Sequence, residues 1–398
     1  MTKRDIGVVG LGVMGQSLAL NLAGRGLAVA VYNRTADRAI EFVQERAADK
    51  AIVAMRDLES LVGAMSLPRK ILLMVKAGAP TDALVDQLLP LLDPGDVLID
   101  GGNAHYADTE RRIERAERLG VFYLGTGISG GELGALHGPS IMAGGSHEAY
   151  AIAGPILEAI AARGPGGACC ARLGARSAGH YVKMVHNGIE YAIMQALAEA
   201  YDLMRRGLVM TAMEAADIFA AWNRGELESY LVEITERILR RVDPETGRPL
   251  VELVLDTAAQ KGTGKWSSQS ALDIGAPAPS IAAAVFARIV SSLKAERIEA
   301  EGILPGPSPS IAVDRDEATC DLFSALYVTM VGAYAQGMRQ LRDVSVERAY
   351  GLDLAEVARV WTAGCIIRAR LLVPIAAALK ANPELPYLLL AEPFRSIW

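Results

Sequence analysis

The spacing of apolar residues changes once along the chain. Up to about residue 177, short β-branched and other apolar runs alternate with amphipathic stretches whose apolar positions recur at helical spacing. The runs predict buried strands at residues 6–9, 28–32, 71–75, 97–99, 121–124, 140–143 and 169–172. The amphipathic stretches predict helices at residues 14–25, 36–46, 81–92 and 107–119. Strands and helices that alternate in this way form a parallel sheet with helices on both faces.

After residue 177 the strand signals nearly vanish, and long stretches rich in Ala, Leu and Ile follow. They predict helices at residues 179–206, 211–223, 230–240, 281–301 and 319–342. We therefore divide the chain into an α/β domain at residues 1–177 and an all-α helical domain at residues 178–398. A length of 398 residues fits two such domains.

The composition is that of a globular protein, with 51% apolar residues and no low-complexity tract. The net charge of −6 argues against nucleic-acid binding, which normally requires a basic surface. No apolar run is long enough to span a bilayer, and the N-terminus lacks a signal-peptide pattern. The four cysteines, Cys169, Cys170, Cys320 and Cys365, lack metal-binding spacing, so we expect reduced thiols in a cytoplasmic protein without a metal.

A glycine fingerprint lies between the first predicted strand and the first predicted helix. Its residues, in the pattern GxGxxG, are Gly10, Leu11, Gly12, Val13, Met14 and Gly15. Glycines at these positions permit a tight turn, and they let a pyrophosphate approach the N–H groups at the helix N-terminus. In this context the fingerprint predicts a Rossmann-type, dinucleotide-binding domain.

The end of the second predicted strand indicates which dinucleotide binds. NAD enzymes normally carry Asp or Glu there to hold the ribose 2′-hydroxyl, whereas this chain has Asn33, Arg34 and Thr35. Arg34 can pair with a 2′-phosphate and stack on adenine. We therefore expect NADP as the cofactor.

Two further loops follow predicted strands at the edge where such sheets bind ligands. One contains Val75, Lys76 and Ala77, and the other contains Asn103 between glycines and the next predicted helix. We expect both loops to face the cofactor, and Asn103 to lie near the reacting centre.

The helix predicted to begin near residue 179 carries a polar stripe. Lys183 and Glu190 are seven residues apart, and His186 and Asn187 lie between them on the same face. The other faces of this helix are apolar, so the stripe is not explained as a solvated surface. An amine, an imidazole, an amide and a carboxylate on a buried helix are suited to line a cavity with a general base and a general acid.

Two glycine-rich segments indicate an anionic substrate. Ser129, with the N–H groups of Gly130 and Gly131, can hold a carboxylate or hydroxyls, although a purely structural glycine turn explains these residues equally well. Lys261 and Thr263 lie in a segment that lacks P-loop spacing but suits a phosphate. Arg288, on the helix predicted at residues 281–301, supplies a further cation. Such local positive groups in an acidic chain predict an anionic small molecule.

The motifs together resemble the 6-phosphogluconate dehydrogenase family, from about residue 6 to the end of the chain. The resemblance rests on IGVVGLGVMG (6–15), YNRT (32–35), ILLMVKAG (71–78), DGGN (100–103), GTGISGGELGALHGPSIM (125–142), AGHYVKMVHNGIEY (178–191), KGTGKWSSQSALDIG (261–275), VFARIVSSLK (285–294) and AGCIIRA (363–369). It implies oxidative decarboxylation of 6-phosphogluconate with NADP, in the pentose phosphate pathway, by a homodimer.

The resemblance also implies roles for individual residues. Lys183 is the base that takes the C3 hydroxyl proton, and Glu190 is the acid that protonates C1 after carbon dioxide leaves. The sugar acid is held by Asn103, Ser129, Gly130, Gly131, His186 and Asn187, and its phosphate by Tyr191, Lys261, Thr263 and Arg288. NADP is held by residues 10–15, 33–35 and 75–77 and by Asn103.

Members of the family continue past the position of Trp398 with more helix and a tail that enters the partner subunit's active site. The resemblance therefore implies that this chain is C-terminally short and lacks an arginine and a histidine that reach the substrate phosphate. Two other hypotheses stay open. One is a β-hydroxyacid dehydrogenase of the 3-hydroxyisobutyrate type, although its unphosphorylated substrate needs no cradle such as residues 261–265. The other is a truncated NADP-binding protein with impaired catalysis.

Overall fold

The computed structural model describes residues 3–260, 262–304, 306 and 313–397. Its contacts divide the chain into two compact units, each assembled from separate stretches. Unit 1 comprises the residues up to Met184 together with Val344–Ile366, and unit 2 comprises Val185–Asp343 with the residues from Ile367 onward. Helices α8 (Ala178–Asp202) and α14 (Arg315–Glu347) contribute to both units. The predicted division at residue 177 stays a prediction.

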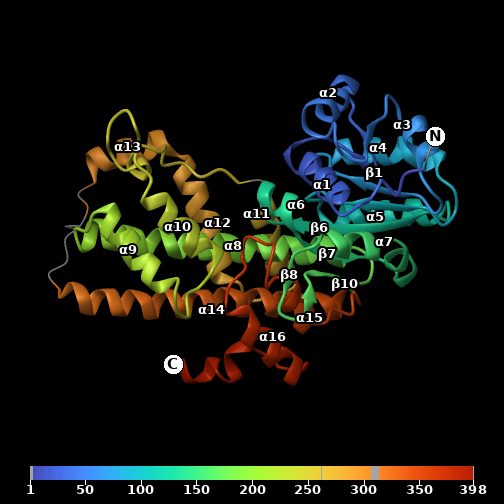
Figure 1. The fold of residues 1–398 in the computed structure, drawn as a ribbon. Coiled ribbons are helices and arrows are strands. Elements are labelled where there is room, and N and C mark those ends of the chain that lie inside the picture. The colour runs from blue at the N-terminus through green and yellow to red at the C-terminus, as the bar shows by residue number, and fades with distance from the viewer. Residues whose placement is uncertain (1–2, 261, 305, 307–312, 398) are drawn as a thin grey trace. The chain divides into compact units, whose positions relative to one another are not determined.

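Unit 1 is built around a sheet of eight strands (Figure 1). In order across the sheet they are β10 (Cys170–Gly174), β7 (Ser140–Gly144), β6 (Phe122–Ser129), β5 (Val97–Asp100), β4 (Lys70–Leu73), β1 (Ile6–Val9), β2 (Val29–Tyr32) and β3 (Ile52–Ala54). Neighbouring strands are parallel, except that β6 and β7 are antiparallel. The structure confirms the predicted α/β class, with one antiparallel pair that the sequence did not indicate.

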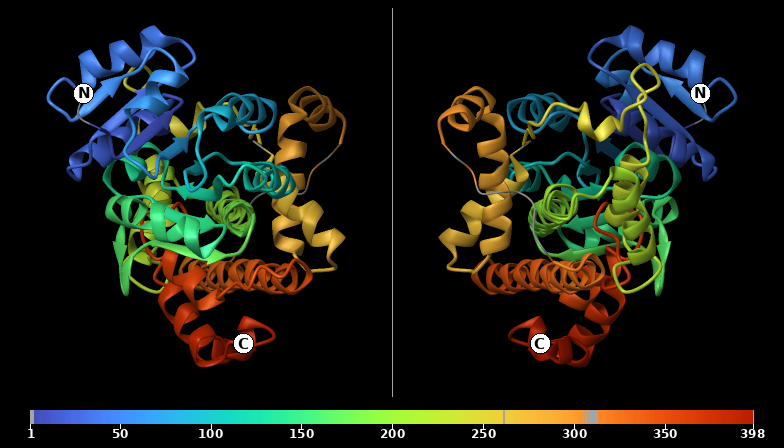
Figure 2. Two further views of the ribbon diagram at one scale, coloured as in Figure 1. Left: turned by 90° about the vertical axis from the view of Figure 1, so that its right-hand side faces the viewer. Right: turned by 90° about the vertical axis from the view of Figure 1, so that its left-hand side faces the viewer.

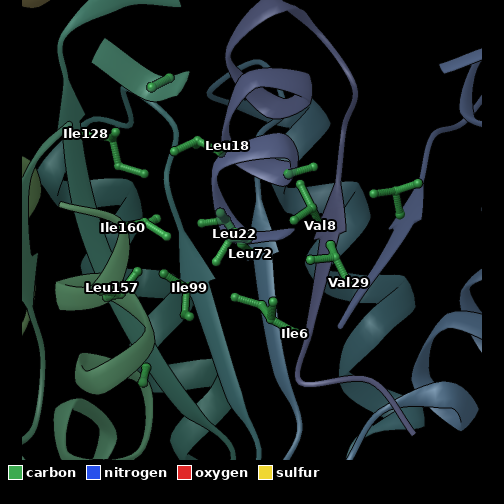
Figure 3. Close-up of a cluster of buried hydrophobic side chains, with 14 of the residues drawn as sticks. Ile6, Val8, Leu18, Leu22, Val29, Leu72, Ile99, Ile128, Leu157 and Ile160 are labelled. Carbon is green, nitrogen blue, oxygen red and sulfur yellow. The ribbon is translucent and has the colours of Figure 1, made fainter. Parts of the chain in front are cut away.

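Alternate residues of the strands supply two cores, one on each face of the sheet. Figure 3 shows the first, in which Ile6 and Val8 of β1 cluster with Leu18 of α1. Helices α1 (Val13–Gly24), α2 (Ala36–Arg46) and α7 (His147–Ile160) contribute to this core. Val9 instead lies in the second core, to which α3 (Leu58–Ala64), α4 (Ala79–Leu88) and α5 (Tyr106–Glu117) contribute. Burial on both faces explains why β1 reads as an uninterrupted apolar run.

Several segments of unit 1 differ from the sequence predictions, which contained neither β3 nor α3. Strand β6 does not end at Leu124, because Gly125–Ser129 pairs with Ser140–Gly144 of β7. Residues 163–168 contain the short antiparallel pair β8 (Arg163–Gly164) and β9 (Gly167–Ala168), for which no strands were predicted. Helix α7 was not predicted, and it contains Pro155, a residue type that normally ends a helix. Unit 1 also contains α6 (Gly131–His137) and α15 (Leu354–Val360).

Helix α8 begins against the sheet with its backbone in direct contact with strand backbones. A side-chain carbon added at Gly179 would lie 2.2 Å from the carbonyl oxygen of Gly125 and 2.3 Å from that of Met142. One added at Gly144 would lie 2.3 Å from the Gly179 nitrogen. Only glycine fits at these positions, so their hydrogen side chains set how closely the helix approaches β6 and β7.

In the described residues of unit 2 the regular elements are all helices, apart from isolated β-bridges. Its helices are α9 (Ala212–Trp222), α10 (Tyr230–Leu239), α11 (Thr263–Asp273), α12 (Pro279–Ser292), α13 (Lys294–Ile303) and α16 (Leu372–Ala381), together with most of α8 and α14. Thr211 and Glu214 form a reciprocal capping box at the start of α9. The predicted all-α character of this part is confirmed.

The helix predicted at residues 281–301 is interrupted at Leu293, which separates α12 from α13. The hydroxyl of Ser291 donates to the carbonyl oxygen of Arg288, and that of Ser292 donates to the carbonyl oxygen of Ile289. Such side-chain bonds compete with the helical hydrogen bonds of the backbone, which explains the break.

Helix α14 is longer than the predicted stretch at residues 319–342, and Figures 1 and 2 show it as one continuous helix. By length and composition alone it could cross a membrane, because its most apolar window has a mean hydropathy of 1.2. A single helix of this kind indicates little, since core helices share these properties. Gly337 brings α14 close to α8, because a carbon added there would lie 2.4 Å from Ile189.

We predict that Gly179→Ala destabilises unit 1 by about 3 kcal/mol or more, because the added methyl group overlaps two carbonyl oxygens. The matched control is Gly63→Ala in α3, where an added carbon meets nothing within 4 Å. In the control, the better helix propensity of alanine should stabilise the protein by about 0.5–1 kcal/mol. Urea unfolding of both variants measures the difference, and equal stabilities would contradict the glycine contact.

Candidate functional site

The glycine fingerprint forms the turn between β1 and α1. Packing requires its first and third glycines, whereas it does not require the second. A carbon added at Gly10, where φ is +98°, would lie 2.6 Å from the Met74 carbonyl oxygen. One added at Gly15 would lie 1.9 Å from the Gly10 carbonyl oxygen. Gly12, at the N-cap of α1, meets nothing within 4 Å. Packing therefore explains Gly10 and Gly15, whereas Gly12 leaves space for a ligand to approach the helix.

The start of α1 is suited to an anion. No side chain caps this helix, and its first turn contains no acidic residue. Val13 in that turn is exposed. The N–H groups of an uncapped first turn, together with the helix dipole, favour a phosphate, so the residues fit the predicted pyrophosphate.

The residues after β2 extend this region. The Asn33 side chain accepts a hydrogen bond from the Leu11 N–H at 3.1 Å and donates to the Thr35 carbonyl oxygen at 3.1 Å. Asn33 thus ties the glycine turn to the loop after β2. Arg34 and Thr35 are exposed beside this loop, as a 2′-phosphate site requires. Thr35 is the N-cap of α2.

The two other predicted cofactor loops lie at the same edge of the sheet. Lys76 is exposed after β4, and its carbonyl oxygen accepts a hydrogen bond from the Thr81 hydroxyl at 3.0 Å. Val75 and Ala77 are half-buried on either side of it. Asn103 is exposed after β5. Parallel strands β1, β4 and β5 are neighbours, so their carboxyl ends bring these loops together.

Lys183 is held against strand β6 within unit 1. Its side chain is buried, with only 6% of the residue exposed. A carbon added at Gly127 would lie 2.3 Å from the Lys183 Cβ atom, so this strand position must be glycine. The sequence pattern placed Gly127 in a loop, but the structure shows that it is the strand residue on which the lysine packs.

The segment from Ser129 to Gly131 joins the end of β6 to α6. Ser129 is buried at the last strand position, and its Oγ atom lies 3.5 Å from the Ile366 nitrogen. Gly130 is required by packing, because an added carbon would lie 2.5 Å from the Gly364 carbonyl oxygen. Gly131 meets nothing within 4 Å and is exposed. The structural explanation therefore holds for Gly130, while Gly131 leaves room for a ligand.

The other part of the polar stripe lies in unit 2. His186 is fully buried, and its Nδ1 atom lies 3.1 Å from Oδ1 of Asn187 and 3.8 Å from Oε2 of Glu190. The Glu190 side chain remains 20% exposed. A partly exposed carboxylate beside a buried imidazole can exchange protons with a ligand. Lys183 precedes Glu190 on α8 by two turns, a rise of about 10 Å.

The predicted phosphate-binding residues converge around Asn187 and Tyr191. The Asn187 amide donates to the Thr263 hydroxyl at 2.9 Å, and Thr263 is the first residue of α11. The Arg288 guanidinium lies 3.8 Å from the centre of the Tyr191 ring and donates to the Ala259 carbonyl oxygen. The start of α11 and this cation suit an anion. Lys261 lies outside the described residues.

Five buried polar residues at the base of the Asn103 loop were not predicted from the sequence. We call them the Asp100 cluster: Asp100, Thr109, Arg112, Tyr123 and His180, each at most 3% exposed. Burial lowers the pKa of His180 and raises the pKa of Tyr123, so both are neutral at neutral pH. The one available signal in the sequence was the position of His180, one turn before Lys183.

Comparison with known proteins matches two family models to the chain. The model named "NAD binding domain of 6-phosphogluconate dehydrogenase" matches residues 5–174, and the model named "6-phosphogluconate dehydrogenase, C-terminal domain" matches residues 179–398. The chain belongs to the 6-phosphogluconate dehydrogenase family. The resemblance recognised in the sequence motifs is thereby confirmed.

Individual members of the family are similar over nearly the whole chain. The NADP(+)-dependent, decarboxylating 6-phosphogluconate dehydrogenase of Bacillus subtilis (strain 168) is 49% identical over 398 residues, covering 100% of this chain and 85% of that relative. The solved Plasmodium falciparum 6-phosphogluconate dehydrogenase, studied alone, with NADP+ and with 6-phosphogluconate, has a TM-score of 0.93 and 41% identity. That match covers 99% of this chain and 85% of the Plasmodium chain.

The 3-hydroxyisobutyrate dehydrogenase of Salmonella typhimurium has a TM-score of 0.56 at 19% identity, covering 74% of this chain and 95% of that one. This likeness shows a shared fold alone.

Proposed function

We propose that this chain catalyses the oxidative decarboxylation of 6-phospho-D-gluconate to ribulose 5-phosphate and carbon dioxide, with reduction of NADP. The observation that carries the proposal is the polar stripe of α8, on which the buried Lys183 and His186 and the partly exposed Asn187 and Glu190 follow one another. Membership of the family supports it, as does the Plasmodium relative described with NADP+ and with 6-phosphogluconate.

The reaction needs a base and an acid, and the stripe supplies both. Lys183, as the neutral amine, takes the proton of the C3 hydroxyl. NADP, which the glycine turn and the residues after β2 would hold, would supply the acceptor for the C3 hydride. The product of this step is a 3-keto acid, whose C3 carbonyl is β to the carboxylate. Loss of carbon dioxide therefore yields an enolate, which the Lys183 ammonium stabilises. Glu190 then donates a proton to the former C2 of the substrate, which becomes C1 of ribulose 5-phosphate. The stripe therefore accounts for decarboxylation without a metal ligand.

We assign the remaining predicted residues to binding. Asn103, Ser129, Gly130, Gly131, His186 and Asn187 hold the sugar acid, and Tyr191, Lys261, Thr263 and Arg288 hold its phosphate. The contact of Asn187 with Thr263 supports this division, because it joins the sugar-binding stripe to the start of α11. The same contact disfavours the 3-hydroxyisobutyrate alternative, whose substrate has no phosphate to occupy such a place.

The proposal predicts that Lys183→Ala and Glu190→Gln each lower kcat for NADPH formation by about 10²–10⁴-fold, the usual contribution of a general acid or base. NADPH absorbance in the presence of 6-phosphogluconate measures the rate. Lys380→Ala, which removes an exposed lysine on α16, is the control and should retain wild-type activity. NADP binding without turnover in the wild-type chain would instead support the catalytically impaired alternative.

The cofactor assignment predicts that Arg34→Ala weakens NADP binding by roughly 10- to 150-fold, because a hydrogen-bonded charge pair contributes about 1.5–3 kcal/mol. Binding of NAD, which has no 2′-phosphate, should change little. Titration calorimetry measures both affinities. Arg56→Ala, which removes another exposed arginine of unit 1, is the matched control. Equal losses for NADP and NAD would contradict a 2′-phosphate contact.

We also propose that the chain forms a homodimer, as the family resemblance implies. Support comes from an apolar stripe along α12, where Phe286 is 67% exposed and Val290 is 54% exposed, with Ile289 and Leu293 beside them. A continuous exposed stripe of this kind is typical of an interface.

The dimer proposal predicts that Phe286→Glu, which places a charge in the stripe, shifts the chain from dimer to monomer. Light scattering coupled to size-exclusion chromatography measures the mass. Val346→Glu, which alters an exposed valine of α14, should leave the dimer intact. A monomeric wild-type chain would reject the proposal.

A further inference from the structure

Asp100 joins separate parts of unit 1. Its Oδ1 atom accepts a hydrogen bond at 3.1 Å from the Gly102 N–H, in the loop after β5. Its Oδ2 atom accepts one at 2.8 Å from the Tyr123 hydroxyl on β6. Its main-chain oxygen lies 3.0 Å from Nε2 of His180, on the turn of α8 before Lys183. One residue thus fixes the loop, the strand and the helix to one another.

The proton positions around His180 follow from the chemistry of its partners. The Asp100 main-chain oxygen can only accept, so Nε2 carries the single proton of the neutral ring. Nδ1 is then an acceptor, and the Thr109 hydroxyl, 2.7 Å away, donates to it. The charged groups that face this ring are the Asp100 carboxylate and Arg112 of α5. The buried ring is therefore held at both nitrogens in a defined orientation.

Arg112 extends the cluster to the loop after β4. Its Nε atom donates to Asp82 at 2.8 Å, and an η nitrogen donates to the Gly78 carbonyl oxygen at 3.2 Å. The other η nitrogen lies 3.5 Å from the Asp100 carboxylate. Gly78 directly follows the predicted cofactor residues Val75 to Ala77 and caps α4. Both loops at this edge of the sheet are thereby tied to Asp100.

We propose that the Asp100 cluster is a positioning device, which holds the turn of α8 that carries Lys183 in a fixed place relative to the loops after β4 and β5. The inference rests on the proposed function, since those loops hold NADP and substrate only in that reaction. The five side chains are positioning residues. They set where the amine of Lys183 meets the C3 hydroxyl, and they transfer no proton to or from the substrate.

The test removes one hydrogen bond from the cluster. Thr109→Val deletes the hydroxyl that donates to His180 but keeps the shape of the side chain, whereas Thr109→Ser keeps the hydroxyl. The matched control is Thr126→Val, which removes another fully buried hydroxyl from strand β6, outside the cluster. Each full-length variant is compared for kcat, for the Michaelis constant of the sugar-acid substrate and for amide hydrogen exchange.

Positioning predicts that Thr109→Val lowers kcat by about 10- to 100-fold, the cost of a small misplacement of a reacting group. The Michaelis constant of the sugar-acid substrate should change little, and the acid limb of the pH profile of kcat/KM should shift. Thr109→Ser should recover most of kcat. Amide exchange at residues 100–104 and 178–184 should become faster in Thr109→Val and stay unchanged in Thr126→Val.

Two results would overturn the inference. Unchanged kcat and unchanged exchange in Thr109→Val would show that the cluster holds nothing in place. An equal loss of kcat in Thr126→Val, with no shift of the pH profile in either variant, would show general destabilisation. Absence of NADPH formation by the wild-type chain would refute the proposed function, and the exchange comparison would then decide by itself whether the cluster holds the loops and the helix.

Tyr123→Phe provides a second variant if Thr109→Val does not fold. It deletes the hydroxyl that donates to the Asp100 carboxylate, on the opposite side of the cluster. The inference requires the same pattern, a fall in kcat with little change in the Michaelis constant and faster exchange at residues 100–104. Wild-type values of all three quantities would overturn it.

Discussion

The backbone contact between helix α8 and the sheet is the constraint on which the rest of the site depends. Gly144 on strand β7 and Gly179 on the helix let main chains meet at distances that any side chain would prevent. Lys183 follows about one turn later on α8 within the same unit, so its place against β6 is set by this contact and by helical geometry.

The same constraint explains how a lysine comes to be buried. A lysine normally keeps its charged end in water. Here the close approach at Gly127 places Lys183 against strand β6 with only 6% of its surface exposed. A lysine that acts as a base must be the neutral amine, because an ammonium group has no lone pair with which to accept a proton.

The buried charged groups near the start of this helix are paired with groups of opposite charge or with hydrogen-bond donors. In the Asp100 cluster the carboxylate of Asp100 faces Arg112 and accepts from Tyr123, while His180 stays neutral. Burying a charge without partners would be costly, and each of these groups instead has a bonded neighbour. A buried network of this kind fixes side-chain orientation, which an apolar core of the same volume would leave to packing alone.

The sequence by itself determined the alternating elements of unit 1, the helical character of unit 2, the cofactor turn and the stripe on α8. These follow from local periodicity and from short motifs, which depend on residues near one another in the chain. Only the tertiary structure decided that Gly125 and Gly127 are strand residues paired with β7, and that Pro155 lies within a helix. It also brought Arg112, from an amphipathic helix, into a fully buried cluster with Asp100 and His180. Those outcomes depend on contacts between residues far apart in sequence. A local sequence pattern does not predict such contacts or their energies.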